Sequence, residues 1–230
     1  MNGSKTKKQK RACFSVKATP WFMGLSNDLM FYIAIDTLFL TTVKHLTASQ
    51  ISFFATISCL CCILLQRPIL KTIKRIGNTK SVRLGVFLLL LGSIIITFAE
   101  SYWFMLIGQV LYTASFQFKF MDNVMLKNNL SYLGKKDDYA KYKNRANIIY
   151  SIVTAIIALC AGFLFNVNHY LPMYLCMGIC VVNVLLSFTL TDENEKQNQE
   201  HQANDNRKKV SFNAVILLIM LCYGIFYAAI

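Results

Sequence analysis

The stretch from Trp21 to Val43 limits the possible folds of this chain more than any other. It reads WFMGLSNDLMFYIAIDTLFLTTV and is long enough to cross a bilayer, whose hydrocarbon core takes roughly 20 helical residues. It nevertheless carries Asn27, Asp28 and Asp36 inside its apolar run. A carboxylate in lipid costs at least ~2.5 kcal/mol, so such acids usually face a protein interior or a watery cavity. The stretch is therefore typical of a membrane helix with a polar face.

The two acids of this stretch suggest a pathway. Asp28 and Asp36 lie about 12 Å apart along a helix, and Tyr32 lies one turn from each. One interpretation is a helix that lines a solute or ion pathway, with Asn27 beside it. The alternative is a static bundle in which the acids are protonated or paired. We favour the pathway, because ionisable residues inside a membrane are functional candidates by default.

Composition agrees with an integral membrane protein. The 230 residues are 55% hydrophobic, and the mean hydropathy is +0.44. The net charge of +13 does not indicate nucleic-acid binding, because the basic residues fall in short segments between apolar runs. We expect no cofactor and no metal site, because the cysteines lie mostly within apolar runs without nearby histidines.

The chain divides into a basic tail (1–19), a six-span bundle (20–190), a hydrophilic linker (191–210) and a seventh span. We expect the tail to be disordered up to Pro20, and Pro68 to end the second span. Since all three prolines fall at span ends, we expect no broken helix. The expected spans are 21–43, 48–66, 84–99, 102–125, 147–165, 172–190 and 211–230.

The basic residues set the expected orientation. The tail, the second-to-third loop, the fourth-to-fifth connection and the linker contain 21 of the 24 lysines and arginines. The connections on the opposite side contain only Lys44. Because positively charged loops stay in the cytoplasm, we expect the amino terminus to be cytoplasmic. We expect the membrane to be the plasma membrane.

Polar residues are concentrated in the first and fourth spans. The fourth span contains Gln109, Gln117, Lys119 and Asp122, and no other span besides the first has an internal ionisable group. These two spans open consecutive three-span units that enter from opposite sides, a pattern typical of transporters built from inverted repeats. We expect Asp28 and Lys119 to meet in the interior.

Six spans, a basic second-to-third loop, a linker and a seventh span resemble the major facilitator superfamily (MFS). The segment RIGNTK resembles the family's loop motif, Asp-Arg-x-Gly-Arg-Lys: Arg75, Gly77 and Lys80 agree, while Lys74 and Asn78 depart from it. The segment from Met121 to Leu130, which contains Asp122, resembles the motif that ends the fourth helix in some branches of the family.

The resemblance implies an all-α membrane fold with a 3+3 inverted repeat, and a secondary transporter that works by alternating access. It implies cytoplasmic gating by Arg75, Gly77 and Asp122. Because family members have about twelve spans, we expect the chain to be the front part of a longer transporter, with the lipid bilayer, a small solute and the missing half as partners. A multi-span receptor or scaffold without transport activity is the alternative. We do not expect an enzyme, because the sequence contains no cluster of candidate catalytic residues. Intramembrane acids suit proton coupling or a cationic solute equally, and the sequence does not choose a substrate.

Overall fold

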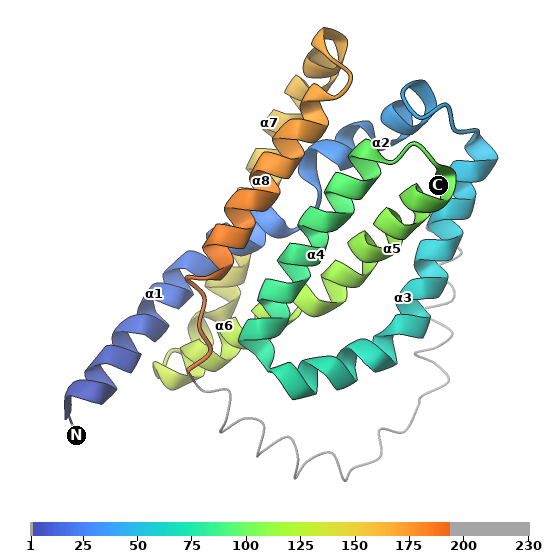
Figure 1. Cartoon of the computed structure of the whole chain (residues 1–230). Helices are drawn as coiled ribbons and strands as arrows, with labels where there is room; N and C mark the ends of the chain where they lie inside the picture. The colour runs from blue at the N-terminus through green and yellow to red at the C-terminus, as the bar shows by residue number, and fades with distance from the viewer. Residues whose placement is uncertain (1, 194–230) are drawn as a thin grey trace, which may run out of the picture. The chain divides into compact units, whose positions relative to one another are not determined.

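A computed structural model of the protein describes residues 2–193, which form a bundle of helices (Figure 1). The expected seventh span and most of the linker lie outside the described residues. Four helical stretches, 7–42, 48–76, 78–98 and 136–167, are long and apolar enough to cross a membrane by length and composition. The elements are α1 (Asn2–Ser26), α2 (Met30–Thr42), α3 (Ala48–Ile76), α4 (Asn78–Phe98), α5 (Tyr102–Lys119), α6 (Met121–Tyr132), the 3-10 turn η1 (Lys136–Asp138), α7 (Tyr139–Val167) and α8 (Leu171–Ser187).

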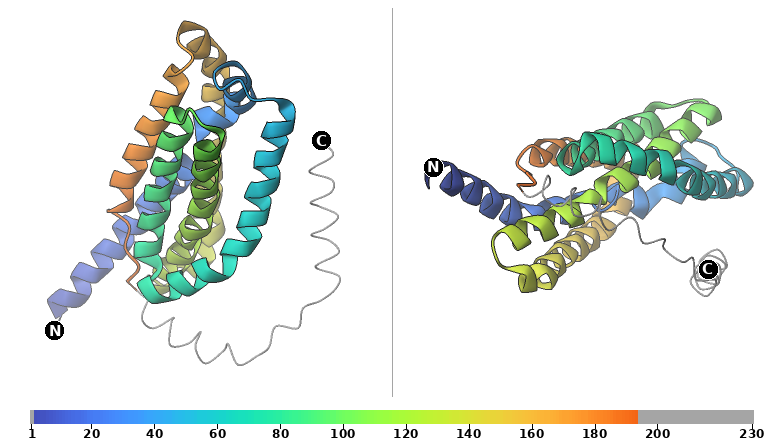
Figure 2. Two further views of the ribbon diagram at one scale, coloured as in Figure 1. Left: turned by 45° about the vertical axis from the view of Figure 1, so that its right-hand side comes forward. Right: turned by 90° about the horizontal axis from the view of Figure 1, so that it is seen from below.

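Helices α4 and α5 run side by side and make the most extensive contact of the bundle (Figures 1 and 2). Glycines allow this approach. A Cβ atom added at Gly85 would lie 2.8 Å from the backbone nitrogen of Lys119, and one added at Gly92 would lie 3.1 Å from the carbonyl oxygen of Gly108. The tight contact fixes α5, and therefore its polar side chains, against the rest of the bundle.

At one end of the bundle, Lys44 joins the α2–α3 loop to the α4–α5 turn. Its Nζ donates to the carbonyl oxygens of Thr97 (2.7 Å) and Ala99 (2.8 Å), at the carboxyl end of α4. The rings of Phe39 and Tyr170 meet edge to face at 5.8 Å and bring the α7–α8 turn to the same end. The short turn predicted at Glu100 is confirmed, because α4 ends at Phe98 and α5 starts at Tyr102.

At the other end, the segment after α8 is fastened to several helices. Ser15 of α1 donates to the carbonyl oxygen of Thr191 at 3.1 Å. The Asp192 carboxylate accepts from Asn78 at 2.8 Å and from Asn128 at 2.9 Å. Asn129 also donates to the Thr191 carbonyl at 2.6 Å. The start of the linker is thus tied to α1, α4 and α6.

Two expectations about helix ends are wrong. The tail is helical, since α1 runs from Asn2 through Pro20 to Ser26. Pro68 lies inside α3, which continues to Ile76 and ends at Gly77, where a positive φ of 87° suits glycine. Figure 1 shows that the last part of α3 turns under α4. The bend accommodates the proline, whose missing N–H a membrane helix tolerates when neighbours compensate.

The first span is broken, although we expected no span to contain a broken helix. α1 ends at Ser26 and α2 begins at Met30, and no proline lies between them. The fourth run also divides, because α5 stops at Lys119 and α6 starts at Met121. Much of the predicted polar connection after it is helical.

Candidate functional site

The break between α1 and α2 is the centre of the candidate site. Its residues Ser26, Asn27 and Asp28 have short polar side chains that compete with helical backbone hydrogen bonds. The Asp28 carboxylate accepts from the backbone N–H of Leu29 at 2.8 Å. A carboxylate at this position also interacts favourably with the positive amino-terminal end of α2. Asp28 therefore stabilises the start of the second half-helix.

The carboxyl end of α1 receives donors from two other helices. Lys119 of α5 donates from Nζ to the carbonyl oxygen of Ser26, and Asn183 of α8 donates from Nδ2 to the carbonyl oxygen of Leu25 at 3.0 Å. The last carbonyls of a helix have no intrahelical partner, and a cation there complements the helix dipole. Tertiary contacts thus satisfy the backbone groups that the break exposes.

One face of α5 lies against the break. Tyr112, Phe116 and Lys119 recur at helical spacing on this face. The Tyr112 hydroxyl donates to the Asp28 carboxylate, while the Tyr112 ring meets the Tyr32 ring edge to face at 6.3 Å. The Lys119 ammonium lies 4.8 Å from the centroid of the Phe116 ring. The cation is therefore enclosed by an aromatic face and a backbone carbonyl.

Burial differs sharply between the two charged groups. Lys119 is 6% exposed, whereas Asp28 is half-buried and Asn27 is exposed. The expected direct meeting of Asp28 and Lys119 is replaced by a different arrangement. Within residues 2–193 no ion pair joins Asp28 and Lys119. Lys119 instead donates to the Ser26 carbonyl oxygen at the end of α1, and Asp28 accepts from the Tyr112 hydroxyl. The site has a buried cationic side and a half-buried acidic side.

The other predicted pathway residues lie apart from this cluster. Asp36 is two turns further along α2 and accepts from the Thr37 hydroxyl at 3.2 Å. Gln109 is half-buried on α5, one turn before Thr113, whose hydroxyl donates to the Gln109 backbone carbonyl at 2.9 Å. The structure therefore brings Asp28, Tyr32 and Lys119 together at the break, with Tyr112 between Asp28 and Tyr32. Asn27 lies in the break and is exposed, and Asp36 makes no hydrogen bond to these residues.

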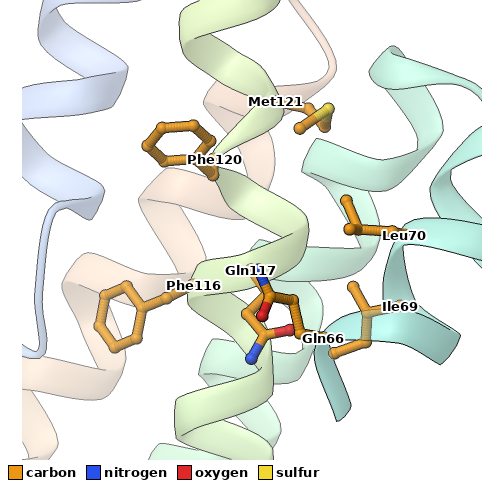
Figure 3. Close-up of a pocket in the computed structure, with 7 residues that line it drawn as sticks. All are labelled: Gln66, Ile69, Leu70, Phe116, Gln117, Phe120 and Met121. Carbon is orange, nitrogen blue, oxygen red and sulfur yellow. The ribbon is translucent and has the colours of Figure 1, made fainter. Parts of the chain in front are cut away.

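Gln117 belongs to a different surface, between α3 and α5. Its amide donates to the Cys62 carbonyl at 2.7 Å. It lines an apolar pocket of about 310 Å³, and Figure 3 shows it among the residues of that pocket. The pocket is lined by Gln66, Ile69, Leu70, Phe116, Gln117, Phe120 and Met121.

Comparison with known families decides the class of the protein. The sequence model of the Major Facilitator Superfamily matches residues 21–230. The chain belongs to the major facilitator superfamily. No curated protein matches it. The predicted family and the all-helical membrane fold are confirmed, and this MFS chain belongs to a class of transporters.

The expected gating residues of this MFS chain are not joined to one another. Arg75 is exposed near the end of α3, and Gly77 forms the turn between α3 and α4. Asp122 is buried, and its carboxylate accepts from the side-chain amide of Asn123 at 2.7 Å. Lys143 of α7 donates to the same Asn123 side chain at 2.8 Å. In the described part of the chain, Asp122 is therefore linked to α7 through Asn123 and makes no hydrogen bond or ion pair to the α3–α4 turn.

Sequence reasoning missed three members of the site: Ser26, Tyr112 and Asn183. Two signals were present. Ser-Asn-Asp is a run of residues that favours turns and helix ends, and Tyr112 is two turns from Lys119 on one face of α5. The bond from Asn183 to the Leu25 carbonyl depends on the packing of α8 against α1, which no local pattern shows. Within residues 2–193 no group of three or more His, Cys, Asp or Glu side chains could hold a metal ion.

Proposed function

We propose that the described helices form the amino-terminal half of a secondary transporter that moves a small solute by alternating access. Family membership supports a transporter. The observation that supports this placement of the pathway is the broken first span, with a half-buried Asp28 and a buried Lys119 at the break. Discontinuous helices near the midplane are where transporters bind solutes and coupling ions.

The arrangement suggests how Asp28 takes part. When ionised, its carboxylate accepts hydrogen bonds from the Tyr112 hydroxyl and the Leu29 N–H. A proton or a cationic solute at the carboxylate weakens both bonds. Loss of these bonds loosens the start of α2 from α5, while Lys119 keeps the end of α1 in place. Occupancy of Asp28 is thereby coupled to the angle between the two half-helices.

We further propose a plasma-membrane location with the amino terminus in the cytoplasm. The basic segments of the sequence support this orientation. An impermeant thiol reagent added outside should modify single cysteines placed at Thr47, Ser101 or Asn168, but not at Lys74 or Lys136. A reporter at Gln199, outside the described residues, should also be protected. Labelling at any of the last three positions would reverse the orientation.

The transport role is tested in proteoliposomes that contain the chain together with its second half and a trapped pH dye. A panel of small solutes is added, and solute-driven proton movement is recorded. We expect at least one solute to move protons in the wild type, and Asp28→Asn to abolish this signal. Asp36→Asn is the matched control and should retain it. Solute movement that is unchanged in Asp28→Asn would remove Asp28 from the pathway.

A further inference from the structure

A basic pocket lies between the first turns of α1 and the end of α8, away from the break. It has a volume of about 760 Å³ and combines residues of α1 with residues that follow α8. The bonds between Ser15 and Thr191 bring these two segments together. The lining residues are Lys7, Lys10, Arg11, Phe14, Phe188, Thr189 and Thr191.

The charged side of the pocket is one stripe of α1. Lys7, Lys10, Arg11 and Phe14 are separated by three, one and three positions and so share a helix face. All four are exposed. Within residues 2–193, none of the three cations has a hydrogen bond or ion pair to an acidic group, and no acidic side chain lines the pocket. An anionic ligand would therefore meet three available cations.

The other side of the pocket is apolar and continues along α8. Phe188 is 60% exposed, and Leu185 and Val181 lie one and two turns before it, 63% and 46% exposed. Arg83 of α4 lies over the Phe188 ring at 5.1 Å and adds a fourth cation at this junction. A strip of exposed hydrocarbon thus leads from the apolar surface of a membrane helix directly to a group of cations.

We propose that this pocket binds an anionic phospholipid. The phosphate of its headgroup pairs with Lys7, Lys10 and Arg11, and one acyl chain lies along Val181, Leu185 and Phe188. A free phosphate would use only the cations and would leave the apolar strip unexplained. The combination of basic side chains with exposed aromatic and aliphatic residues is typical of contact with an anionic membrane surface.

The direct test titrates dioleoyl phosphatidylglycerol into the delipidated full chain in detergent, with bound lipid counted by native mass spectrometry. We expect the triple variant Lys7→Gln, Lys10→Gln, Arg11→Gln to bind more than tenfold more weakly, since each cation near a membrane surface contributes about fivefold. The matched control removes three exposed lysines elsewhere: Lys135→Gln, Lys136→Gln, Lys141→Gln. It should change the affinity less than twofold.

Two further arms separate the sources of the phosphate. Dihexanoyl phosphatidylglycerol should bind more weakly than the dioleoyl lipid, and Leu185→Ser should reduce that difference. Millimolar inorganic phosphate should not displace the dioleoyl lipid. Displacement by phosphate would show a site for a soluble anion and overturn the proposal. Equal losses in both triple variants, or unchanged binding in the first, would also overturn it.

Discussion

The first span and α3 differ in how they accommodate residues that interrupt helices. α3 contains Pro68 and remains helical from Ala48 to Ile76. The first span has no proline near its middle and breaks between Ser26 and Met30. The difference lies in what surrounds each point. The carbonyls at the break receive side chains from α5 and α8, whereas Pro68 is exposed on a helix that can bend.

The comparison shows that a membrane helix breaks where other helices provide hydrogen bonds for its backbone. An unpaired backbone group in hydrocarbon costs several kcal/mol, so a break without partners would not persist. Proline removes only one backbone N–H donor, and a bend of the helix accommodates the missing hydrogen bond. The break therefore depends on α5, and substitutions that move α5 or remove its donors should affect it most.

The largest effect should come from Gly85→Ala. Its Cβ would lie 2.8 Å from the Lys119 backbone nitrogen and 2.9 Å from the Ser115 carbonyl oxygen, and backbone atoms cannot move aside easily. We expect a loss of about 3 kcal/mol in the free energy of unfolding, measured by thermal unfolding in detergent. Gly162→Ala on α7 is the control, because nothing described lies within 4 Å of the added atom. Equal stability of the two variants would contradict the tight α4–α5 contact.

Lys119→Met removes the donor from the end of α1. It leaves the buried Ser26 carbonyl without a partner, which should cost about 2 kcal/mol. Lys127→Met, on an exposed position of α6, controls for the loss of a lysine. A cost below that of the control would mean that the break does not need this contact.

Tyr112→Phe removes only a hydroxyl from the other side of the break. We expect a loss of about 1 kcal/mol, and a double-mutant cycle with Asp28→Asn should show coupling of similar size. Tyr174→Phe, on a half-exposed ring of α8, is the control. Strict additivity of the Tyr112 and Asp28 changes would indicate that the two groups act independently.

Pro68→Ala tests α3, which remains continuous where the first span is broken. The alanine N–H can restore the bond to the Leu64 carbonyl, so we expect a gain of about 0.5–1 kcal/mol and no loss of helix. Circular dichroism and thermal unfolding measure both quantities. A large destabilisation would show that the proline, like the break, is fixed by tertiary contacts.

The smallest effect concerns Lys44, which caps α4 outside the span as Lys119 caps α1 inside it. Burial lowers the pKa of Lys44 below 10.5, and Glu100 opposes this shift. Between the lowered pKa and 10.5 the unfolded chain binds more protons, so stability should rise slightly with pH in that window. Lys44→Met should abolish this rise in pH-dependent melting curves. A rise of the same size in the variant would assign it to another group.

The sequence predicted the membrane fold and the polar character of the first and fourth spans, because hydropathy and charge are local properties. It also identified Asp28, Tyr32 and Lys119 as residues of interest. It did not place the break, because the Ser-Asn-Asp run alone does not decide it: the break also depends on Asn183 and Lys119, which are distant from Ser26 in sequence. The course of α3 through Pro68 was missed for the same reason: a bend depends on the neighbours of a helix.

The most direct test is the backbone conformation of residues 26–30, read from 13Cα chemical shifts in selectively labelled protein in detergent or nanodiscs. We predict non-helical shifts at Asn27, Asp28 and Leu29, beside helical shifts through residues 64–72 around Pro68. In Lys119→Met combined with Asn183→Leu, the shifts at Asn27 and Asp28 should move toward helical values. Helical shifts across residues 26–30 in the wild type would contradict the account.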